Sequence, residues 1–208
     1  MLVVKWRKGM MGVMLVGALW GQAALAAELD WKLKKSRNGV SAYTAKMENN
    51  DHLAFKGETL LQGRTLDQVI AVMRDVPNLD QWLYTCYEPV ILQEEEGMSR
   101  IVHMKNSTPT FLVAERDLVL RQAIERTSPT TAVMTLTGLP DQMPPQKSFV
   151  RIPYFDGKWE FEQTADGVRA IYSGVIDPGG GLPASITNMM VVDTPFETLK
   201  NLTAFMAR

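Results

Sequence analysis

The sequence M-P-P-Q-K-S-F-V-R at residues 143–151 opens the part of the chain that decides the fold. Strand-like segments follow it, then D-P-G-G-G-L-P at residues 177–183, and then an apolar helical pattern at residues 184–206. A meander of antiparallel strands therefore leads directly into one long C-terminal helix. This order predicts an α+β domain in which a curved sheet wraps around the helix and leaves a cavity between them. Such a cavity favours carriage of an apolar molecule over catalysis.

Tight turns divide the rest of the chain into short strands. Asn-Gly and Asp-Gly pairs supply the positive φ angles that match the twist of paired strands, so they are strong hairpin signals. They occur at Asn38-Gly39, Asp156-Gly157 and Asp166-Gly167, and longer turns are expected at Glu96-Gly97 and at residues 127–130. Asp156-Gly157, for example, is expected to separate strands at residues 149–155 and 158–164. The sheet should therefore be antiparallel and built mostly from sequence neighbours.

Two segments have the apolar spacing of a helix. The first is residues 65–74, which Pro77 ends, and the second is residues 184–206, which Pro195 interrupts. An interior proline removes a hydrogen bond at a cost of about 3 kcal/mol or more. Because Thr194-Pro195-Phe196-Glu197 matches a capping box, the sequence predicts a kinked helix, or two helices end to end, with the break at Asp193-Thr194. Its methionine-rich face suits either an ordinary core or a surface that adapts to varied ligands.

The first 26 residues are typical of a secretory signal peptide. Lys5, Arg7 and Lys8 form a basic region, residues 9–20 are almost wholly apolar, and Ala24-Leu25-Ala26 is an A-x-A cleavage site. The apolar run is too short to cross a hydrocarbon core of about 30 Å. We expect cleavage after Ala26 and export to a bacterial periplasm. An uncleaved membrane anchor and secretion from a eukaryotic cell are the alternatives.

The remaining residues, 27–208, suit one domain, because a chain of this size buries about 70% of its unfolded surface. Loss of the three basic leader residues takes the net charge from −1 to −4. A mildly acidic chain without a basic run has no electrostatic footprint for nucleic acid. It also lacks the polybasic patch that would hold it firmly on anionic lipid, so membrane contact is expected to be transient.

The sequence has no familiar catalytic or metal-binding motif. It lacks G-x-S-x-G, H-E-x-x-H, C-x-x-C, a P-loop and G-x-G-x-x-G. With only His52 and His103 as histidines, neither a metal site nor a cofactor is expected. Cys86, the only cysteine, is expected to be a small buried apolar residue, and a reactive pair with His103 is the alternative. The glycines at residues 179–181 suit a flexible turn, or a phosphate cradle before the last helix.

Arg116 and Asp117 begin an otherwise apolar strand, R-D-L-V-L. Adjacent strand residues point to opposite faces, so one of the two should face the concave side. A buried arginine is unfavourable unless it is paired or hydrogen-bonded. Either the pair forms a salt bridge that fixes the end of the strand, or Arg116 points inward and binds a polar headgroup or hydroxyl.

Four segments, in order, resemble the START domain, the lipid-transfer fold named after the steroidogenic acute regulatory protein. Residues 76–83, with an aspartate and a tryptophan, resemble the segment before its first cavity strand. Residues 115–119, E-R-D-L-V, resemble its R-D-F-V strand, and residues 143–151 resemble its M-P-x-Q-x-x-x-x-R motif. The last segment is D-P-G-G at residues 177–180, with Pro183 and Asn188. The resemblance covers about residues 31–206, nearly all of the mature chain.

The resemblance implies a helix-grip fold that holds one lipid in an internal hydrophobic tunnel. It places the loop of residues 139–147 over the tunnel mouth beside the last helix, and it places Arg116 at the polar end. In sterol-binding members an acidic residue faces that arginine, whereas residues 102–104 here are Val-His-Met, which makes His103 a candidate polar group. The expected ligand-binding residues are Arg116, His103, Trp82, Met104, Met189, Met190 and Phe196, and the expected gate residues are Leu139, Met143, Pro144 and Pro145.

The sequence therefore predicts a periplasmic protein that binds and transfers a lipid or other hydrophobic small molecule. A phospholipid, a sterol-like molecule and a fatty acid all suit this prediction. The first alternative is a helix-grip enzyme, such as a cyclase or hydrolase, that acts in the same cavity. The second is an interaction module whose lid region binds a partner when the cavity is filled.

Overall fold

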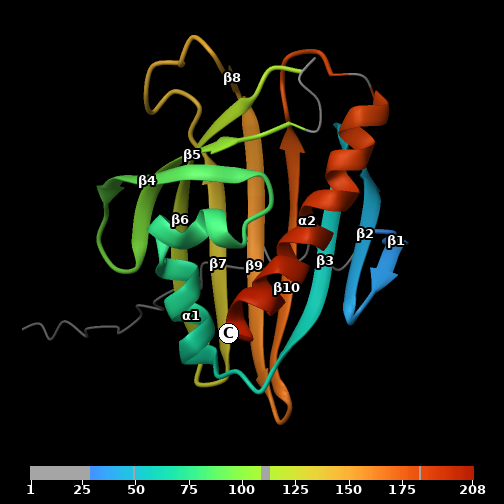
Figure 1. Cartoon of the computed structure of the whole chain (residues 1–208), viewed down its shortest axis with the longest axis vertical. Helices are drawn as coiled ribbons and strands as arrows, with labels where there is room; N and C mark the ends of the chain where they lie inside the picture. The colour runs from blue at the N-terminus through green and yellow to red at the C-terminus, as the bar shows by residue number, and fades with distance from the viewer. Residues whose placement is uncertain (1–28, 49, 109–112, 183) are drawn as a thin grey trace, which may run out of the picture.

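The computed structural model describes residues 29–48, 50–108, 113–182 and 184–208. Within these residues one curved sheet forms the body of the molecule, and a long helix lies in front of it (Figure 1). The elements are β1 (Lys32–Arg37), β2 (Val40–Met47), β3 (Asn50–Gln62), α1 (Leu66–Arg74), the 3-10 helix η1 (Val76–Gln81), β4 (Cys86–Glu94), β5 (Ser99–Asn106), β6 (Arg116–Ser128), β7 (Thr131–Gly138), β8 (Val150–Arg151), β9 (Tyr154–Thr164), β10 (Gly167–Asp177) and α2 (Ala184–Met206).

The strand order across the sheet is β1-β2-β3-β10-β9-β7-β6-β5-β4. Each of these neighbouring pairs is antiparallel, as expected from the hairpin signals. Two features depart from a simple meander. β3 pairs with the distant β10, and the short β8 pairs in parallel with the start of β6. The chain crosses from β3 to the far edge of the sheet through α1 and η1, which lie on the same side as α2 (Figure 1).

The expected turn at Asp156-Gly157 is wrong. β9 runs without interruption from Tyr154 to Thr164, and Gly157 pairs with Leu136 on one side and Gly174 on the other. A Cβ atom at Gly157 would lie 2.8 Å from Cζ of Phe155, so a larger residue would force the Phe155 ring to shift, and glycine avoids this contact. The expected hairpins at Asn38-Gly39 and Asp166-Gly167 are confirmed.

The first helix begins and ends as expected. The Thr65 side chain accepts a hydrogen bond from the backbone of Gln68, whose own side chain accepts one from the backbone of Thr65, which is a complete capping box. Of the two forms expected for α2, two helices end to end is wrong, because α2 is one continuous helix with Pro195 inside it. Thr194 therefore starts no new helix. A kink at Asp193-Thr194 stays a prediction.

The edge strand β1 is joined to α2 by the side chain of Lys35. Lys35 of β1 binds Asp193 at 2.9 Å and Glu197 at 3.2 Å, the two acids that flank Pro195, and its ammonium group lies 4.2 Å from the centre of the Phe196 ring. The helix contacts β2, β3 and β10 as well. One half of the concave face of the sheet is therefore covered by α2, and the other half is covered by α1 and η1 (Figure 1).

No helix among the described residues is both long and apolar enough to cross a membrane. The predicted signal peptide, residues 1–26, lies outside the described residues, so its cleavage stays a prediction.

Candidate functional site

A cavity lies between the sheet, α2 and the segment that leads from α1 through η1 to β4. Most of the residues that line it are apolar: Phe55, Met73, Leu79, Trp82, Leu83, Met104, Leu118, Leu120, Met134, Leu136, Ile152, Phe155, Trp159, Ile176, Pro178, Met190 and Val191. The polar ones are Tyr84, Thr85, Asn106, Ser107, Thr108, Arg116, Gln122, Tyr172, Thr187 and Thr194. Tyr84 is 36% exposed, so the cavity approaches solvent beside it.

Aromatic rings form the floor of the cavity. Trp159 of β9 stacks on Tyr172 of β10, with ring centroids 4.3 Å apart, because the two residues are directly paired across the strands. Phe55 packs edge-on against Tyr172, and Trp82 packs edge-on against Trp159. Burial raises the pKa of Tyr172, so its phenol stays neutral. The floor offers a rigid apolar surface to a ligand.

The free volume of the cavity is about 100 Å³. Ligand sites for drug-sized molecules commonly measure about 300–1,000 Å³. A lipid therefore needs the walls to move apart before it can enter. Three methionines, Met73, Met104 and Met134, line the cavity together with Met190, and their unbranched side chains can adopt new rotamers at small cost.

Among the described residues of the lining, Arg116 alone carries a full charge. It is 3% exposed, and its guanidinium donates to the backbone carbonyls of Ala114, Pro178 and Gly179. No carboxylate among the described residues forms a salt bridge with it, and burial alone lowers its pKa. Asp117, its neighbour in the chain, points to the other face, as the alternation of a strand requires.

The glycines before α2 shape a turn whose carbonyl groups bind Arg116. Gly179 and Gly180 adopt φ angles of 64° and 70°, which a glycine adopts at no steric cost. The turn directs the carbonyl groups of Pro178 and Gly179 at Arg116, while the amide of Gly179 donates to Asp177 at 2.8 Å. The carbonyls and not the amides therefore face the charged group, which supports a turn over a phosphate cradle.

Asn106 faces Arg116 from the next strand, because the two residues are direct partners in the β5–β6 ladder. Such partners have Cβ atoms about 4.5–5.5 Å apart on the same face of the sheet. The hydroxyl of Thr85 donates to Oδ1 of Asn106 at 3.5 Å, whereas Nδ2 of Asn106 is buried without a hydrogen-bond partner among the described residues. Nε1 of Trp82, on the wall of the same cavity, is also buried without a hydrogen-bond partner among the described residues. The cavity thus offers donors that lack acceptors.

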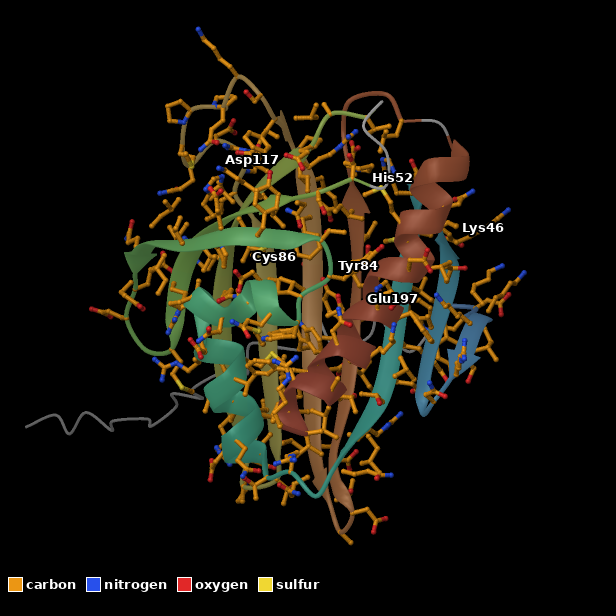
Figure 2. The ribbon with its side chains drawn as sticks, viewed as in Figure 1. Lys46, His52, Tyr84, Cys86, Asp117 and Glu197 are labelled. Atoms are coloured by element: carbon orange, nitrogen blue, oxygen red, sulfur yellow. The ribbon has the colours of Figure 1, made fainter. Side chains whose placement is uncertain are left out.

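His103 does not line the cavity, which corrects the expectation that it faces inward. It lies on the opposite face of β5, where its Nε2 is 3.2 Å from Oδ2 of Asp117. Arg151 donates to both carboxylate oxygens of Asp117, at 3.0 Å and 2.7 Å. His103, three positions before Asn106 in the strand, therefore belongs to a buried ionic cluster around Asp117 on the far side of the sheet. Asp117 is labelled in Figure 2.

The expected gate loop, residues 139–147, has no helix or strand, but none of its residues lines the cavity. That includes Leu139, Met143, Pro144 and Pro145. Arg151 holds the loop, because its Nη1 donates to the carbonyls of Pro140 at 2.6 Å and Met143 at 3.1 Å. The loop is fixed to the ionic cluster of Asp117, and a role as gate stays a prediction.

The other expected ligand-binding residues divide into two groups. Trp82, Met104 and Met190 line the cavity together with Arg116. Phe196 does not line the cavity. Its ring packs against the ammonium group of Lys35 of β1 instead. The side chain of Met189 lies outside what the structure describes. The sequence reasoning missed Asn106, the last residue of β5, and Thr85, which lies in the turn before β4.

The lining includes no histidine, cysteine, aspartate, glutamate or lysine among the described residues. No cluster of metal-ligating side chains occurs in that part of the chain either. Cys86 is buried outside the lining, and burial raises the pKa of its thiol to about 12. The described part of the cavity wall therefore presents apolar contact and hydrogen-bond donors.

Comparison with known proteins gives one consistent result. The family model described as "START domain" matches residues 21–208. An uncharacterized protein of Pseudomonas aeruginosa is 31% identical over 189 residues, which cover 90% of this chain and 92% of that protein. The crystal structure of a STAR-related lipid transfer protein from Xanthomonas axonopodis has a TM-score of 0.79 at 31% identity, covering 86% of this chain and 99% of that chain. Human STARD10 has the same fold, with a TM-score of 0.74 at 16% identity, covering 85% of this chain and 73% of that chain.

Proposed function

The chain belongs to the START domain family, and we propose that it binds a single lipid or similar hydrophobic small molecule in its cavity and transfers it between membranes. The match to a STAR-related lipid transfer protein over most of both chains supports hydrophobic ligand binding. The observation that carries the proposal is the cavity itself: an apolar enclosure with an aromatic floor and one buried cation, Arg116.

Partition from water supplies the affinity. Each methylene group that leaves water gains about 0.8 kcal/mol, so a chain of a dozen methylenes binds strongly even after the cost of opening the walls. Arg116 fixes the orientation of the ligand by receiving its polar end, because no other described residue of the lining carries a charge. The apolar end then extends over Trp159 and Tyr172.

Entry and exit require α2 or the segment of residues 82–85 to move. A hydrogen bond joins these two walls: the backbone amide of Tyr84 donates to Thr198 of α2 at 3.3 Å. Tyr84 is also the exposed end of the lining. A contact with a membrane surface at Tyr84 would break this bond in favour of apolar contacts and release the ligand. The contact is transient, since the chain lacks a polybasic patch.

The place of action is proposed to be the periplasm, on the basis of the leader at residues 1–26. Amino-terminal sequencing of the protein recovered from a periplasmic extract tests this directly. The expected first residue is Ala27, and recovery of the uncleaved chain in the membrane fraction would replace export by membrane anchoring.

Two other functions use the same cavity. An enzyme needs an acid or base that touches its substrate, and the lining offers neither a carboxylate nor an imidazole among the described residues. A ligand-gated interaction module would show a partner that binds only the filled protein. Neither function has a specific observation in its favour, so lipid transfer is the better supported proposal.

A transfer assay tests the proposal. Donor vesicles carry a self-quenched fluorescent phospholipid or fatty acid, acceptor vesicles carry none, and the rate of dequenching is followed with and without the protein. Catalytic amounts of protein should raise the rate in proportion to their concentration. An unchanged rate for both probes, combined with no binding of either probe in solution, would contradict the proposal.

A further inference from the structure

We propose that the polar end of the cavity selects ligands that carry a single negative charge, and that Asn106 and Arg116 make this selection together. The inference rests on the proposed function, and it names the ligand class that the same site takes. It follows from three observations on the described residues: a buried cation without a counter-charge, an amide donor without an acceptor, and a third residue that fixes the orientation of that amide.

The first observation concerns charge. Arg116 is 3% exposed and has backbone carbonyls as its hydrogen-bond partners, but no carboxylate among the described residues pairs with it. Carbonyl dipoles compensate a buried charge only in part, and a buried cation is most stable when an anion lies against it. A ligand with one negative charge would complete this site, whereas a cationic headgroup would be repelled.

The second observation concerns Asn106, which stands directly opposite Arg116 in the ladder. An acid at this position would neutralise the arginine internally. Asparagine has nearly the same shape and no charge, so the cation is left for the ligand. The Nδ2 group of Asn106 is buried and has no hydrogen-bond partner among the described residues, so it is a second donor available to the same polar end of the ligand.

The third observation explains why Asn106 presents its donor. Thr85 donates its hydroxyl to Oδ1 of Asn106, so the oxygen is already used and the amide nitrogen is the free end. Thr85 has a φ angle of 65°, a backbone conformation that a β-branched residue adopts at a cost. Its carbonyl accepts from the amide of Ser107 at 2.9 Å, which holds the strained residue in place. Strain of this kind commonly occurs at functional sites.

A carboxylate and a phosphodiester share the required chemistry, because each carries one negative charge and only accepts hydrogen bonds. An alcohol offers no charge. The three classes can be compared at equal chain length with palmitate, palmitoyl lysophosphatidylglycerol and hexadecanol, each titrated below its aggregation concentration. Binding is followed by the fluorescence of Trp82 and Trp159, which line the cavity.

The expected result is that at least one anionic ligand binds about tenfold or more tightly than hexadecanol, as a charge-assisted hydrogen bond implies. Tight binding of palmitate alone identifies a carboxylate site, and tight binding of the lysophospholipid alone identifies a phosphodiester site. Hexadecanol that binds as well as both anions would overturn the inference and leave the proposed function intact. Failure of all three ligands to bind would count against the proposed function itself.

The variant Asn106→Asp is the decisive test of the residue. It places a carboxylate opposite Arg116, and it should bring the affinity ratio of anion to alcohol close to one. Asn38→Asp is the matched control, because it adds the same charge at an exposed hairpin position and should leave the ratio unchanged. Should Asn106→Asp fail to fold, Asn106→Ala removes the donor without adding charge and should weaken anion binding about three- to tenfold. A ratio unaffected by either variant would overturn the role of Asn106.

Discussion

Arg151 binds Asp117 with two parallel hydrogen bonds, Nε to Oδ1 at 3.0 Å and Nη2 to Oδ2 at 2.7 Å. The aspartate is completely buried, and His103 approaches the same carboxylate from β5. Because Arg151 also donates to the loop carbonyls of Pro140 and Met143, this one pair joins β5, β6, β8 and the loop before β8. It is a structural centre on the face of the sheet opposite to the cavity.

Asp117→Asn should therefore destabilise the protein strongly. The substitution leaves the guanidinium of Arg151 buried without its counter-charge, and breaking a buried pair in this way costs about 3–5 kcal/mol. Urea unfolding followed by circular dichroism measures the loss. Arg169→Gln is the control, because it breaks exposed ion pairs with Glu58 and Glu162 and should cost at most about 1 kcal/mol. Equal losses in the two variants would contradict the central position of Asp117.

The stability of the protein should fall in acid through the same carboxylate. Burial acts to raise the pKa of Asp117, but the hydrogen bonds and charge of Arg151, with a smaller contribution from His103, hold it below its ordinary value. A lowered pKa in the folded state means that the stabilisation is fully present above the unfolded pKa of about 3.9 and is lost as the pH falls through the folded value. Unfolding midpoints measured from pH 7 down to pH 2 should drop below about pH 4. Asp117→Asn should show a shallower drop, and identical profiles would assign the effect to other carboxylates.

The ion pairs of Lys35 should restrict the motion of α2. The hydrogen bond to Asp193 and then that to Glu197 raise the pKa of Lys35, and the two acids stand on either side of Pro195, where the helix lacks a backbone hydrogen bond. Lys35→Met should speed amide hydrogen exchange in the middle of α2 and raise the rate of ligand release several-fold. Lys32→Met, at an exposed position of the same strand, should do neither. Unchanged exchange in the Lys35 variant would show that these ion pairs do not stabilise α2.

Filling the cavity should abolish ligand binding without unfolding the protein. Met190 lines the cavity from α2, and Met190→Trp places an indole in a free volume of about 100 Å³. Overpacking of this kind costs about 1–3 kcal/mol, which a domain of this size tolerates. A binding titration with palmitate should show little or no uptake, while Lys200→Trp on the exposed face of the same helix should bind normally. Full binding by the Met190 variant would place the ligand elsewhere.

Cys86 should be unreactive in the native protein. Its thiol is buried and its pKa is raised to about 12, so the thiolate that attacks disulfide reagents is almost absent at pH 8. Labelling with a chromogenic disulfide should be slow in buffer and fast in denaturant. Rapid stoichiometric labelling of the folded protein would revive a catalytic role for the thiol.

Local patterns predicted the fold where a local rule decides the structure. The hairpin at Asn38-Gly39 formed because its two residues alone determine the turn. Asp156-Gly157 carries the same signal, yet it lies inside β9, where Gly157 pairs with neighbouring strands on both sides and its missing Cβ leaves room for the Phe155 ring. The capping-box pattern at Thr194–Glu197 does not begin a second helix, because α2 continues through Pro195.

The polar end of the site was predicted only in part. Arg116 could be placed because strand alternation puts it and Asp117 on opposite faces. Its partner could not, because nine residues connect β5 to β6 and no short turn fixes their register. The expectation settled on His103, whereas the ladder brings Asn106 opposite Arg116, three positions further along and on the other face. The gate loop was placed by resemblance, and its anchoring by Arg151 is a long-range contact that sequence spacing does not reveal.

The most direct test of ligand carriage is native mass spectrometry of the protein isolated from its own periplasm, followed by organic extraction and identification of what it holds. We expect one molecule of an anionic amphiphile per protein chain, which is lost in the Met190→Trp variant. Protein that is empty in every preparation, and that stays empty after incubation with lipid vesicles, would contradict lipid carriage by this cavity.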